Sequence, residues 1–372
     1  MMKNRNKHIL WVTTWYPNDF HSTLGNFVQR HAQSAALNDS VTVVAPIAGS
    51  SWSVVSEEIE GVNEVRSYYP KYMRIFGAYI AYKRALKHVD GSFNAVHGHA
   101  LISCWWMLLH AIFIMKKPVL LTEHWAGFHH NDERKLPWLK RQMMKVVGRK
   151  VIAPLPVTAH LGNVMKKLGY IKRFQVVPNV VDVDVFKPKS HKSNPDFCRF
   201  IHVSTLDDAQ KNIRGLLNVC VELRKKTESF HLEIIGDGAI TPWITLAKQL
   251  ELFPKFVTIE GEKPLREIAD RMQAADALVL FSRYENFPCV IAEAWSCGIP
   301  ILSTDVGGIS EYQNSDNGVL IKPEDERALV HAMKTMIGAH ANYAPSTIRA
   351  FANTHFSKAS IGQRFHEIYS EC

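Results

Sequence analysis

Residues 282–311 read SRYENFPCVIAEAWSCGIPILSTDVGGISE and directly follow the apolar run ALVLF at residues 277–281. A short apolar run, a helical pattern and a second apolar run predict a strand–helix–strand unit, and hence a parallel sheet. Pro288 suits the first turn of the helix, and Asn286 can cap its N-terminus. Backbone amides and the helix dipole make such a helix end a binding site for an anion such as a diphosphate.

The same alternation of strand and helix patterns extends outward through the chain. Its 372 residues are too many for one ordinary core. The polar stretch KPKSHKSNPD at residues 187–196 contains two prolines and reads as a linker. We therefore predict two Rossmann-like α/β domains, residues 1–186 and 187–350, whose mainly parallel sheets face each other across a cleft. Residues 351–372 are expected to form a C-terminal helix that packs back on the N-terminal domain.

Two acidic residues stand out beside the expected anion site, because Glu285 and Glu293 are separated by seven residues. An ionised carboxylate only accepts hydrogen bonds, so it can bind two hydroxyl donors at once. Glu293 would bind a ribose diol, as the acidic residue of a dinucleotide fold does. Glu285 would bind the hydroxyls of a sugar. Taken alone, either glutamate could equally be an exposed surface residue.

The stretch resembles the large family 4 of retaining glycosyltransferases (group 1), which has the GT-B fold. The resemblance lies in the paired glutamates, a Glu-Ala helix, a Gly-x-Pro and a Gly-Gly pair before another Glu, here Glu285, Glu293, Ala294, Gly298, Pro300, Gly307, Gly308 and Glu311. Upstream, VVPNVVDVDVF at 176–186 resembles the string that joins the two domains, with Val180 where Gly is usual. IIGDG at 234–238 resembles another strand of the family. The resemblance is dense over residues 174–325.

This resemblance implies a hexosyltransferase that moves a sugar from a UDP- or GDP-sugar to a hydroxyl of a glycan or lipid-linked acceptor, in surface polysaccharide biosynthesis. It implies no cofactor, and a front-face path in which a donor phosphate oxygen helps to deprotonate the acceptor. His124, Lys211 and Glu285 would be catalytic. The implied donor-binding residues are Gly25, Thr205, Lys211, Glu285, Asn286, Phe287, Pro288, Val290 and Glu293.

The diphosphate contacts include one departure from the family. Lys211 matches the family's phosphate-binding lysine, but the position of its arginine falls on Thr205. Arg214 or Arg283 could substitute. The alternative interpretation of Lys211 is an ordinary exposed lysine at a helix start.

Histidines mark the N-terminal half. His124 follows the run LLTE and resembles the family's histidine beside the donor sugar, while His99 resembles one that lines the cleft on the acceptor side. Most single histidines are structural, and that alternative stays open. His97 and His99 share a strand face, but no third ligand has suitable spacing, so we predict no metal. Gly25 is either a close-approach glycine for phosphate or acceptor, or a simple turn glycine.

Charge and composition limit which partners we expect the chain to bind. Residues 1–180 hold 23 Lys and Arg against 10 Asp and Glu, which indicates an anionic partner or merely a solvated basic face. No nucleic-acid-binding motif is present. Residues 133–150 mix apolar residues with cations, six Lys or Arg between 135 and 150, and could lie on an anionic bilayer, or be a core-packed helix with a basic outer face. The apolar run 101–115 is too short to span a bilayer.

Six cysteines without metal-ligand or C-x-x-C spacing predict reduced thiols and a cytoplasmic protein, in which membrane association at the cytoplasmic face is an option. Two rival functions remain open on the same fold. One is a sugar-nucleotide epimerase or hydrolase. The other is a sugar-nucleotide-binding protein without turnover, which the threonine at position 205 favours. Fold alone does not separate these functions.

Overall fold

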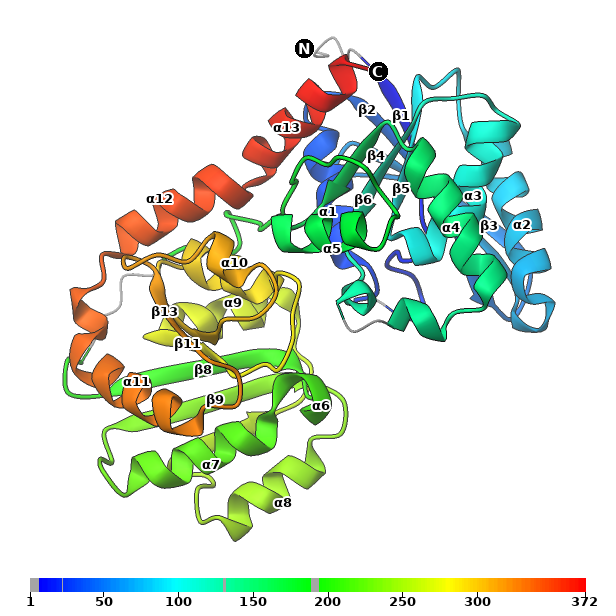
Figure 1. Cartoon of the computed structure of the whole chain (residues 1–372). Coiled ribbons are helices and arrows are strands. Elements are labelled where there is room, and N and C mark those ends of the chain that lie inside the picture. Colours follow the sequence, from blue (N-terminus) through cyan, green and yellow to red (C-terminus); the bar gives the residue numbers. More distant parts are fainter. Residues whose placement is uncertain (1–6, 22, 130–131, 189–193) are drawn as a thin grey trace. The chain divides into compact units, whose positions relative to one another are not determined.

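The computed structural model describes residues 7–21, 23–129, 132–188 and 194–372. The chain forms two compact units (Figure 1). The N-terminal unit comprises Met1–Val180 with Lys358–Cys372, and the C-terminal unit comprises Val181–Ser357. Each unit is built on its own sheet.

The N-terminal unit has a seven-stranded sheet in the order β3-β4-β2-β1-β5-β6-β7. All neighbours are parallel except β3 with β4, and the strands are β1 (His8–Val12), β2 (Ser40–Gly49), β3 (Ser53–Ile59), β4 (Val62–Pro70), β5 (Ala95–His99), β6 (Val119–Glu123) and β7 (Ala153–Pro156). One core packs against α2 (Arg74–Ala85), α3 (Leu101–Phe113), α4 (Trp138–Lys150) and α5 (Ala159–Lys167). The other core packs against α1 (Asn26–Ala35) and α13 (Lys358–Ser370).

The β3–β4 hairpin is the part of this sheet that the sequence analysis missed. Strand β3, SVVSEEI, is an edge strand without a fully buried residue, so it has no apolar alternation to mark it. Glu60 and Gly61 both have positive φ, 47° and 79°, as a two-residue hairpin turn requires. The prediction of a mainly parallel sheet is nevertheless correct.

The C-terminal unit has a six-stranded, all-parallel sheet in the order β10-β9-β8-β11-β12-β13. Its strands are β8 (Cys198–Thr205), β9 (Phe230–Asp237), β10 (Val257–Glu260), β11 (Ala277–Leu280), β12 (Ile301–Thr304) and β13 (Gly318–Ile321). Helices α7 (Ile213–Arg224), α8 (Thr241–Gln249) and α11 (Glu326–Ala339) belong to one core. Helices α9 (Leu265–Ala274), α10 (Cys289–Ser296) and α12 (Pro345–Phe356) belong to the other. A parallel sheet covered on both faces is the doubly wound arrangement.

The division between the units differs from the boundary we expected after residue 186. Val181 and Phe186 are fully buried in the core of the C-terminal unit. The Ser296 hydroxyl and the Arg349 guanidinium both donate to the Phe186 carbonyl, at 2.6 and 3.1 Å. The apolar side chains therefore attach this segment to the C-terminal unit, and the expected linker at 187–196 falls within the range of that unit instead of between the two units. Part of that linker, residues 189–193, lies outside the described residues.

The C-terminal segment also differs from the expectation, because it forms two helices and not one. Helix α12 belongs to the C-terminal unit, and α13 begins after Ser357 and packs on α1 of the N-terminal unit. Gly362 of α13 lies so close to α1 that a Cβ there would be 2.2 Å from the Ser34 carbonyl oxygen. The Tyr369 hydroxyl hydrogen-bonds with His97 Nδ1 at 2.7 Å. These contacts fix α13 on the unit.

Two further helices have ends or lengths that local sequence explains. The Thr158 hydroxyl caps α5 by accepting from the Leu161 amide at 3.1 Å, and Gly169 follows the helix with φ 75°. The run 101–115 forms the 13-residue helix α3. None of the described helices is both long and apolar enough to cross a bilayer.

The contact at Gly362 gives a stability prediction. We expect Gly362→Ala to lower the free energy of unfolding by about 1–3 kcal/mol, because the new methyl group overlaps the α1 backbone. The better helix propensity of Ala, worth about 1 kcal/mol, would offset only part of this cost. Urea denaturation of the full chain, followed by tryptophan fluorescence, measures the change.

The matched control is Gly338→Ala in α11, where an added Cβ meets nothing within 4 Å. We expect this variant to be unchanged, or more stable by up to about 1 kcal/mol. Equal shifts in both variants would show that helix propensity, and not the contact between α13 and α1, decides the result.

Candidate active site

Each sheet reverses its strand order at one point, which is where α/β sheets bind ligands. In the C-terminal unit the reversal lies between β8 and β11, and in the N-terminal unit between β1 and β5. Thr205 ends β8, and Ser282 follows β11 by two residues. His99 ends β5. The predicted residues therefore gather at the carboxyl edge of each sheet.

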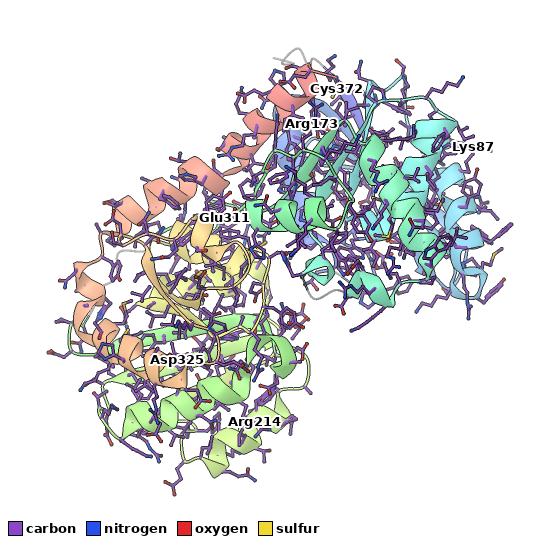
Figure 2. All side chains as sticks on the ribbon, in the orientation of Figure 1. Lys87, Arg173, Arg214, Glu311, Asp325 and Cys372 are labelled. Carbon is purple, nitrogen blue, oxygen red and sulfur yellow. The ribbon has the colours of Figure 1, made fainter. Side chains whose placement is uncertain are left out.

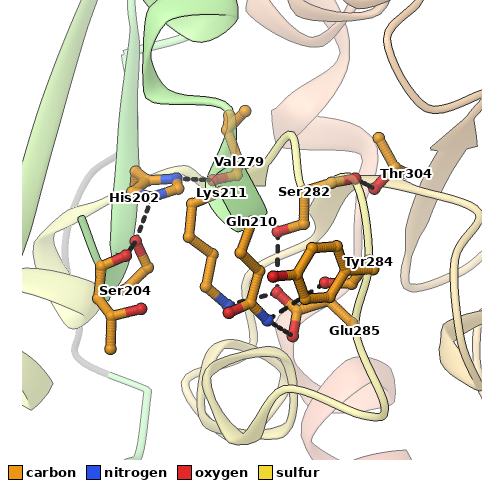
Figure 3. A network of polar contacts seen from close by, with 10 residues as sticks. His202, Ser204, Gln210, Lys211, Val279, Ser282, Tyr284, Glu285 and Thr304 are labelled. Carbon is orange, nitrogen blue, oxygen red and sulfur yellow. Dashed lines mark hydrogen bonds and ion pairs between the residues drawn. The ribbon is translucent and has the colours of Figure 1, made fainter. Parts of the chain in front are cut away.

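The centre of the C-terminal site is an ion pair between Lys211 Nζ and Glu285 Oε1 (Figure 3). Both residues are buried, at 8% and 6% exposed. The Ser282 hydroxyl donates to the same carboxylate at 2.8 Å, and Gln210 Nε2 lies 3.4 Å from its second oxygen. The interpretation of Lys211 as an ordinary exposed lysine is therefore wrong. A pair this buried needs such additional hydrogen bonds, because removing two charges from water is costly.

The loop after β8 is shaped to present Lys211. It contains the short helix α6 (Asp208–Lys211), whose first turn is capped by the Asp207 side chain. Asn212 follows with φ 53°, and its side chain caps α7 by accepting from the Gly215 amide at 3.3 Å. Two successive caps thus turn the chain so that the Lys211 side chain points at Glu285.

Arg283 joins this loop to the segment that carries Glu285. Its guanidinium donates to the Asp208 carbonyl, to Asn212 Oδ1 at 2.7 Å and to Glu324 at 2.9 Å. A phosphate contact by Arg283 would compete with these three acceptors. Arg214 is exposed on α7 (Figure 2). Thr205 is exposed at the end of β8. Nothing in this arrangement replaces the family's arginine directly.

Helix α10 begins differently from the expectation. Its N-cap is Pro288, with φ −67° and ψ 127°, and no side chain caps it, so the predicted cap by Asn286 is wrong. The Asn286 carbonyl instead accepts from the Gly308 amide at 2.8 Å, and Phe287 is buried against Phe356. Val290, in the first turn, is partly exposed. An anion bound at this helix end would take the place of a side-chain cap.

Glu293 lies one turn along α10 and is 7% exposed. The Gly-Gly pair holds the segment before the helix in place. Gly307 has φ 61°, and a Cβ there would lie 2.2 Å from the Glu285 carbonyl oxygen. Only glycine fits such a position. The motif therefore has a structural role, since it positions Glu285.

The N-terminal site is a cluster of three histidines: His124 after β6, His99 at the end of β5 and His31 in α1. His124 Nε2 lies 3.4 Å from His99 Nδ1, and the two rings stack with their centroids 5.6 Å apart. His99 is fully buried and stacks on Trp11. The expectation that His99 lines a cleft is therefore wrong, because its ring supports His124. His124 itself is partly exposed.

His31 was missed by the sequence analysis, which found no third ligand for a metal. One ligand nitrogen from each of the three rings lies within 4.8 Å of the others. His31 Nε2 donates to the Pro178 carbonyl at 2.8 Å, so its Nδ1 carries a lone pair in the neutral ring. Three neutral imidazoles can hold an ion such as Zn²⁺, or can hydrogen-bond the hydroxyls of a sugar. The only sequence signal for His31 was its place on the buried face of a helix.

Glu123 is a second residue that the sequence did not reveal. Its buried carboxylate accepts from the backbone amides of Leu101, His124 and Trp125, at 3.0, 2.9 and 2.8 Å. Burial raises the pKa of Glu123 to about 7. The carboxylate fixes the backbone that carries His124. As the last residue of a strand, it looked like an ordinary polar strand end.

Gly25 is the N-cap of α1 and has φ 69°. A Cβ at this position would lie 2.2 Å from the Trp15 carbonyl oxygen. The local backbone therefore requires glycine whether or not a ligand approaches it. This explains the residue as a turn glycine, and its expected contact with the donor stays a prediction.

Two α/β units, each with its polar residues at the carboxyl edge of a parallel sheet, define the GT-B class of glycosyltransferases. Two family models match this chain: "Glycosyltransferase Family 4" over residues 26–185 and "Glycosyl transferases group 1" over residues 198–338. The chain belongs to this family of glycosyltransferases.

Solved structures share the fold at low sequence identity. Sucrose-phosphate synthase from Thermosynechococcus elongatus is similar with a TM-score of 0.79 and 17% identity, over 98% of this chain and 99% of that one. HepE of Anabaena in complex with UDP-glucose is similar with a TM-score of 0.76 and 16% identity, over 99% and 100% of the two chains.

Among curated relatives, the putative teichuronic acid biosynthesis glycosyltransferase TuaC of Bacillus subtilis is 21% identical, over 87% of this chain and 88% of its own length. The gpi3 subunit of the Schizosaccharomyces pombe phosphatidylinositol N-acetylglucosaminyltransferase is 23% identical over 74% of this chain. That match spans only 60% of the fission-yeast protein.

The buried histidines predict acid sensitivity. Burial lowers the pKa of His31, and of His202 in the C-terminal unit, to about 4. Burial also lowers the pKa of three further histidines, His97, His99 and His124, well below the usual value. Below pH 6.5 these histidines bind protons in the unfolded chain but not in the folded one. Each then removes about 1.4 kcal/mol of stability per pH unit until the folded pKa is reached. The raised pKa of Glu123 gives an opposite slope of one proton between about pH 4.5 and 7.

The histidines outnumber Glu123, so we expect the free energy of unfolding in urea to fall steadily from pH 7 to pH 5. His31→Gln should reduce the slope by about one proton. His88→Gln, at an exposed position, is the control and should leave the slope unchanged. A flat or rising stability over this range would contradict neutral burial of the cluster.

Proposed function

We propose that this glycosyltransferase moves a sugar from a UDP- or GDP-sugar to a hydroxyl of a glycan or lipid-linked acceptor, with retention of anomeric configuration. The observation that carries the proposal is the buried Lys211–Glu285 pair at the carboxyl edge of a doubly wound sheet. The named roles of TuaC and of the colanic acid glycosyltransferase WcaL of Escherichia coli, which is 28% identical over 48% of this chain, favour a role in surface polysaccharide biosynthesis.

In this proposal the donor lies across the edge of the C-terminal sheet. The Lys211 ammonium and the first turn of α10, near Val290, bind the diphosphate, and Thr205 and Gly25 approach the same group. Glu293 binds the ribose hydroxyls, and Glu285 binds hydroxyls of the transferred sugar. The pair is ready for this role, because Glu285 holds the lysine at the place where phosphate charge develops.

The chemistry needs positioning more than a strong base. The bond between the anomeric carbon and the phosphate oxygen breaks, and its electron pair leaves with the diphosphate. The acceptor oxygen forms the new bond on the same face, and its proton passes to a phosphate oxygen. Lys211 stabilises the charge that accumulates on the leaving group. His124, neutral because burial lowers its pKa, hydrogen-bonds a sugar or acceptor hydroxyl.

We further propose that the reaction takes place in the cytoplasm at the face of a membrane. Helix α4 offers mixed support for contact with that membrane. Val147 is buried and Leu136 packs against the core, whereas Leu139 is 63% exposed and Val146 is 36% exposed. This pattern fits a core-packed helix with a basic outer face, and membrane contact through α4 stays a prediction.

Removing the ion pair should abolish transfer without unfolding the chain. We expect Lys211→Ala and Glu285→Ala each to lower kcat/KM by roughly a hundredfold to a thousandfold, the range typical for losing one electrostatic contact to the transition state. A thermal-shift panel of UDP- and GDP-sugars first identifies the donor, because a specific ligand stabilises the folded state. Lys226→Ala, at an exposed lysine, is the control and should keep full activity.

The double variant Lys211→Met/Glu285→Gln separates stability from chemistry. It removes both buried charges together, so we expect a folded protein that is as inactive as the single variants. Near-normal rates in Lys211→Ala and Glu285→Ala would overturn the assignment. Conversion of the donor without any acceptor would instead indicate an epimerase or hydrolase, and donor binding without product would indicate a non-catalytic binder.

No metal is required by this mechanism, although the histidine cluster could hold one. We expect transfer by enzyme dialysed against a chelator to equal that of untreated enzyme, and elemental analysis of the active protein to find less than stoichiometric zinc. Loss of activity on chelation, with recovery on adding Zn²⁺, would make His31, His99 and His124 a metal site instead.

A further inference from the structure

Helix α2 of the N-terminal unit has its large apolar side chains on the outside. The residues that it buries against β2 and β4 are mostly small: Gly77, Ala78, Ala81, Tyr82 and Ala85. Its outward side carries Tyr72 from the preceding turn, 83% exposed, then Ile75 at 55%, Phe76 at 75%, Tyr79 at 44% and Ile80 at 36%. We call these five residues the α2 face. The spacing of Ile75, Phe76, Tyr79 and Ile80 places these four residues on one stripe of the helix, and Tyr72 lies in the turn before it.

The tight packing of α2 on its sheet explains only why the residues on the buried side are mostly small. A Cβ at Gly77 would lie 2.5 Å from the Tyr69 ring and 2.7 Å from Met73 Cβ, so the sheet accepts only small residues there. On the opposite side Tyr79 makes edge contacts with Trp106 and His110 of α3, with ring centroids 6.3 Å apart in both cases, so α3 covers part of its ring. Ile75 and Phe76 are more exposed than Tyr79, at 55% and 75%. A surface helix normally carries polar residues there, and a contiguous exposed apolar patch marks an interaction site.

The charge around the α2 face is of one sign. Between residues 71 and 89 the chain has five cations and no Asp or Glu. All five are exposed: Lys71, Arg74, Lys83, Arg84 and Lys87, the last beyond the C-terminal end of the helix (Figure 2). Within the described part of the chain, none of these five forms an ion pair. The surface thus combines exposed apolar and aromatic side chains with uncompensated positive charge.

We propose that the α2 face docks the N-terminal unit on the surface of an anionic lipid bilayer. Apolar side chains can enter the boundary between headgroups and acyl chains, tyrosines suit the interface, and the flanking cations attract anionic headgroups. A symmetric contact with a second copy of this chain would bring ten cations together, which disfavours that occupant. A nucleic acid would leave Ile75 and Phe76 without a suitable partner.

The position of the α2 face also fits the chemistry, and this step rests on the proposed function. Helix α2 begins at Arg74, four residues after β4 ends at Pro70, so its first turn lies near the carboxyl edge of the sheet. The same edge carries His99 and the segment with His124, because β5 and β6 run parallel to β4. Docking by α2 would bring a lipid-linked acceptor to the edge of the sheet where His124 lies.

Co-sedimentation with vesicles tests the docking. The purified full chain is mixed with vesicles of phosphatidylcholine containing about a third phosphatidylglycerol, and with pure phosphatidylcholine vesicles. We expect binding to the anionic vesicles that weakens with salt, and at least tenfold weaker binding to the neutral ones. Ile75→Ser/Phe76→Ser should weaken binding to anionic vesicles at least tenfold, and Lys83→Gln/Lys87→Gln several-fold.

The control is Leu265→Ser, which removes another exposed apolar residue, 41% exposed, from α9 of the C-terminal unit. It should bind as the unchanged protein does. Circular dichroism and the thermal shift given by the donor should be unaffected in all variants, since none of them lies at the site. Loss of donor binding would therefore concern the proposed function, and loss of vesicle binding alone concerns the α2 face.

Three results would overturn the proposal. The first is no binding of the unchanged protein to anionic vesicles. The second is weakening by Leu139→Ser in α4 but not by Ile75→Ser/Phe76→Ser. The third is a dimer in analytical ultracentrifugation that Ile75→Ser/Phe76→Ser dissociates, without any effect on vesicle binding, because the α2 face would then serve a second copy of the chain.

Discussion

The buried ion pair between Lys211 and Glu285 is the interaction on which the C-terminal site depends. Two charges taken out of water are tolerated only if their geometry is fixed and their remaining hydrogen-bonding positions are filled. The chain meets this requirement with Ser282 and Gln210 on the carboxylate, with Arg283 between the two loops, and with a glycine pair whose close approach leaves no room for a side chain behind Glu285. The edge of the sheet is therefore prepared for a charged ligand before any ligand arrives.

The N-terminal site is organised on the opposite principle. Burial keeps His31, His99 and His124 neutral, and hydrogen bonds with backbone groups hold the cluster in place. A carbonyl orients His31, and the Glu123 carboxylate binds the amides around His124. Neutral imidazoles exchange hydrogen bonds with hydroxyls without adding charge. In the proposed function, the first site binds the diphosphate and His124 of the second binds a sugar or acceptor hydroxyl.

Features that depend on residues close together in the sequence could be predicted, and features that depend on distant residues could not. The strands around residues 282–311 depend on nearby residues, and they were predicted. The capping by Asn286 was wrong because the helix starts after Pro288, and the Asn286 carbonyl pairs with Gly308 instead. His31 meets His99, His124 and Pro178, which are distant in sequence, so no spacing reveals it. Glu123 looked like an ordinary polar residue at a strand end. The polar edge strand β3 lacks the alternation that marks a half-buried strand.

Helix α2 shows a further limit of pattern reading, because periodicity gives a stripe but not its direction. A stripe of Ile, Phe and Tyr opposite Gly and Ala would ordinarily be assigned to the core, since large apolar residues stabilise most when buried. Here the sheet admits only the small side, as the short distances at Gly77 require. The large residues consequently face outward among cations, and the unit does not bury them. The exposed apolar residues, together with the cations of α2 and its flanks, are the basis of the proposed docking on an anionic surface.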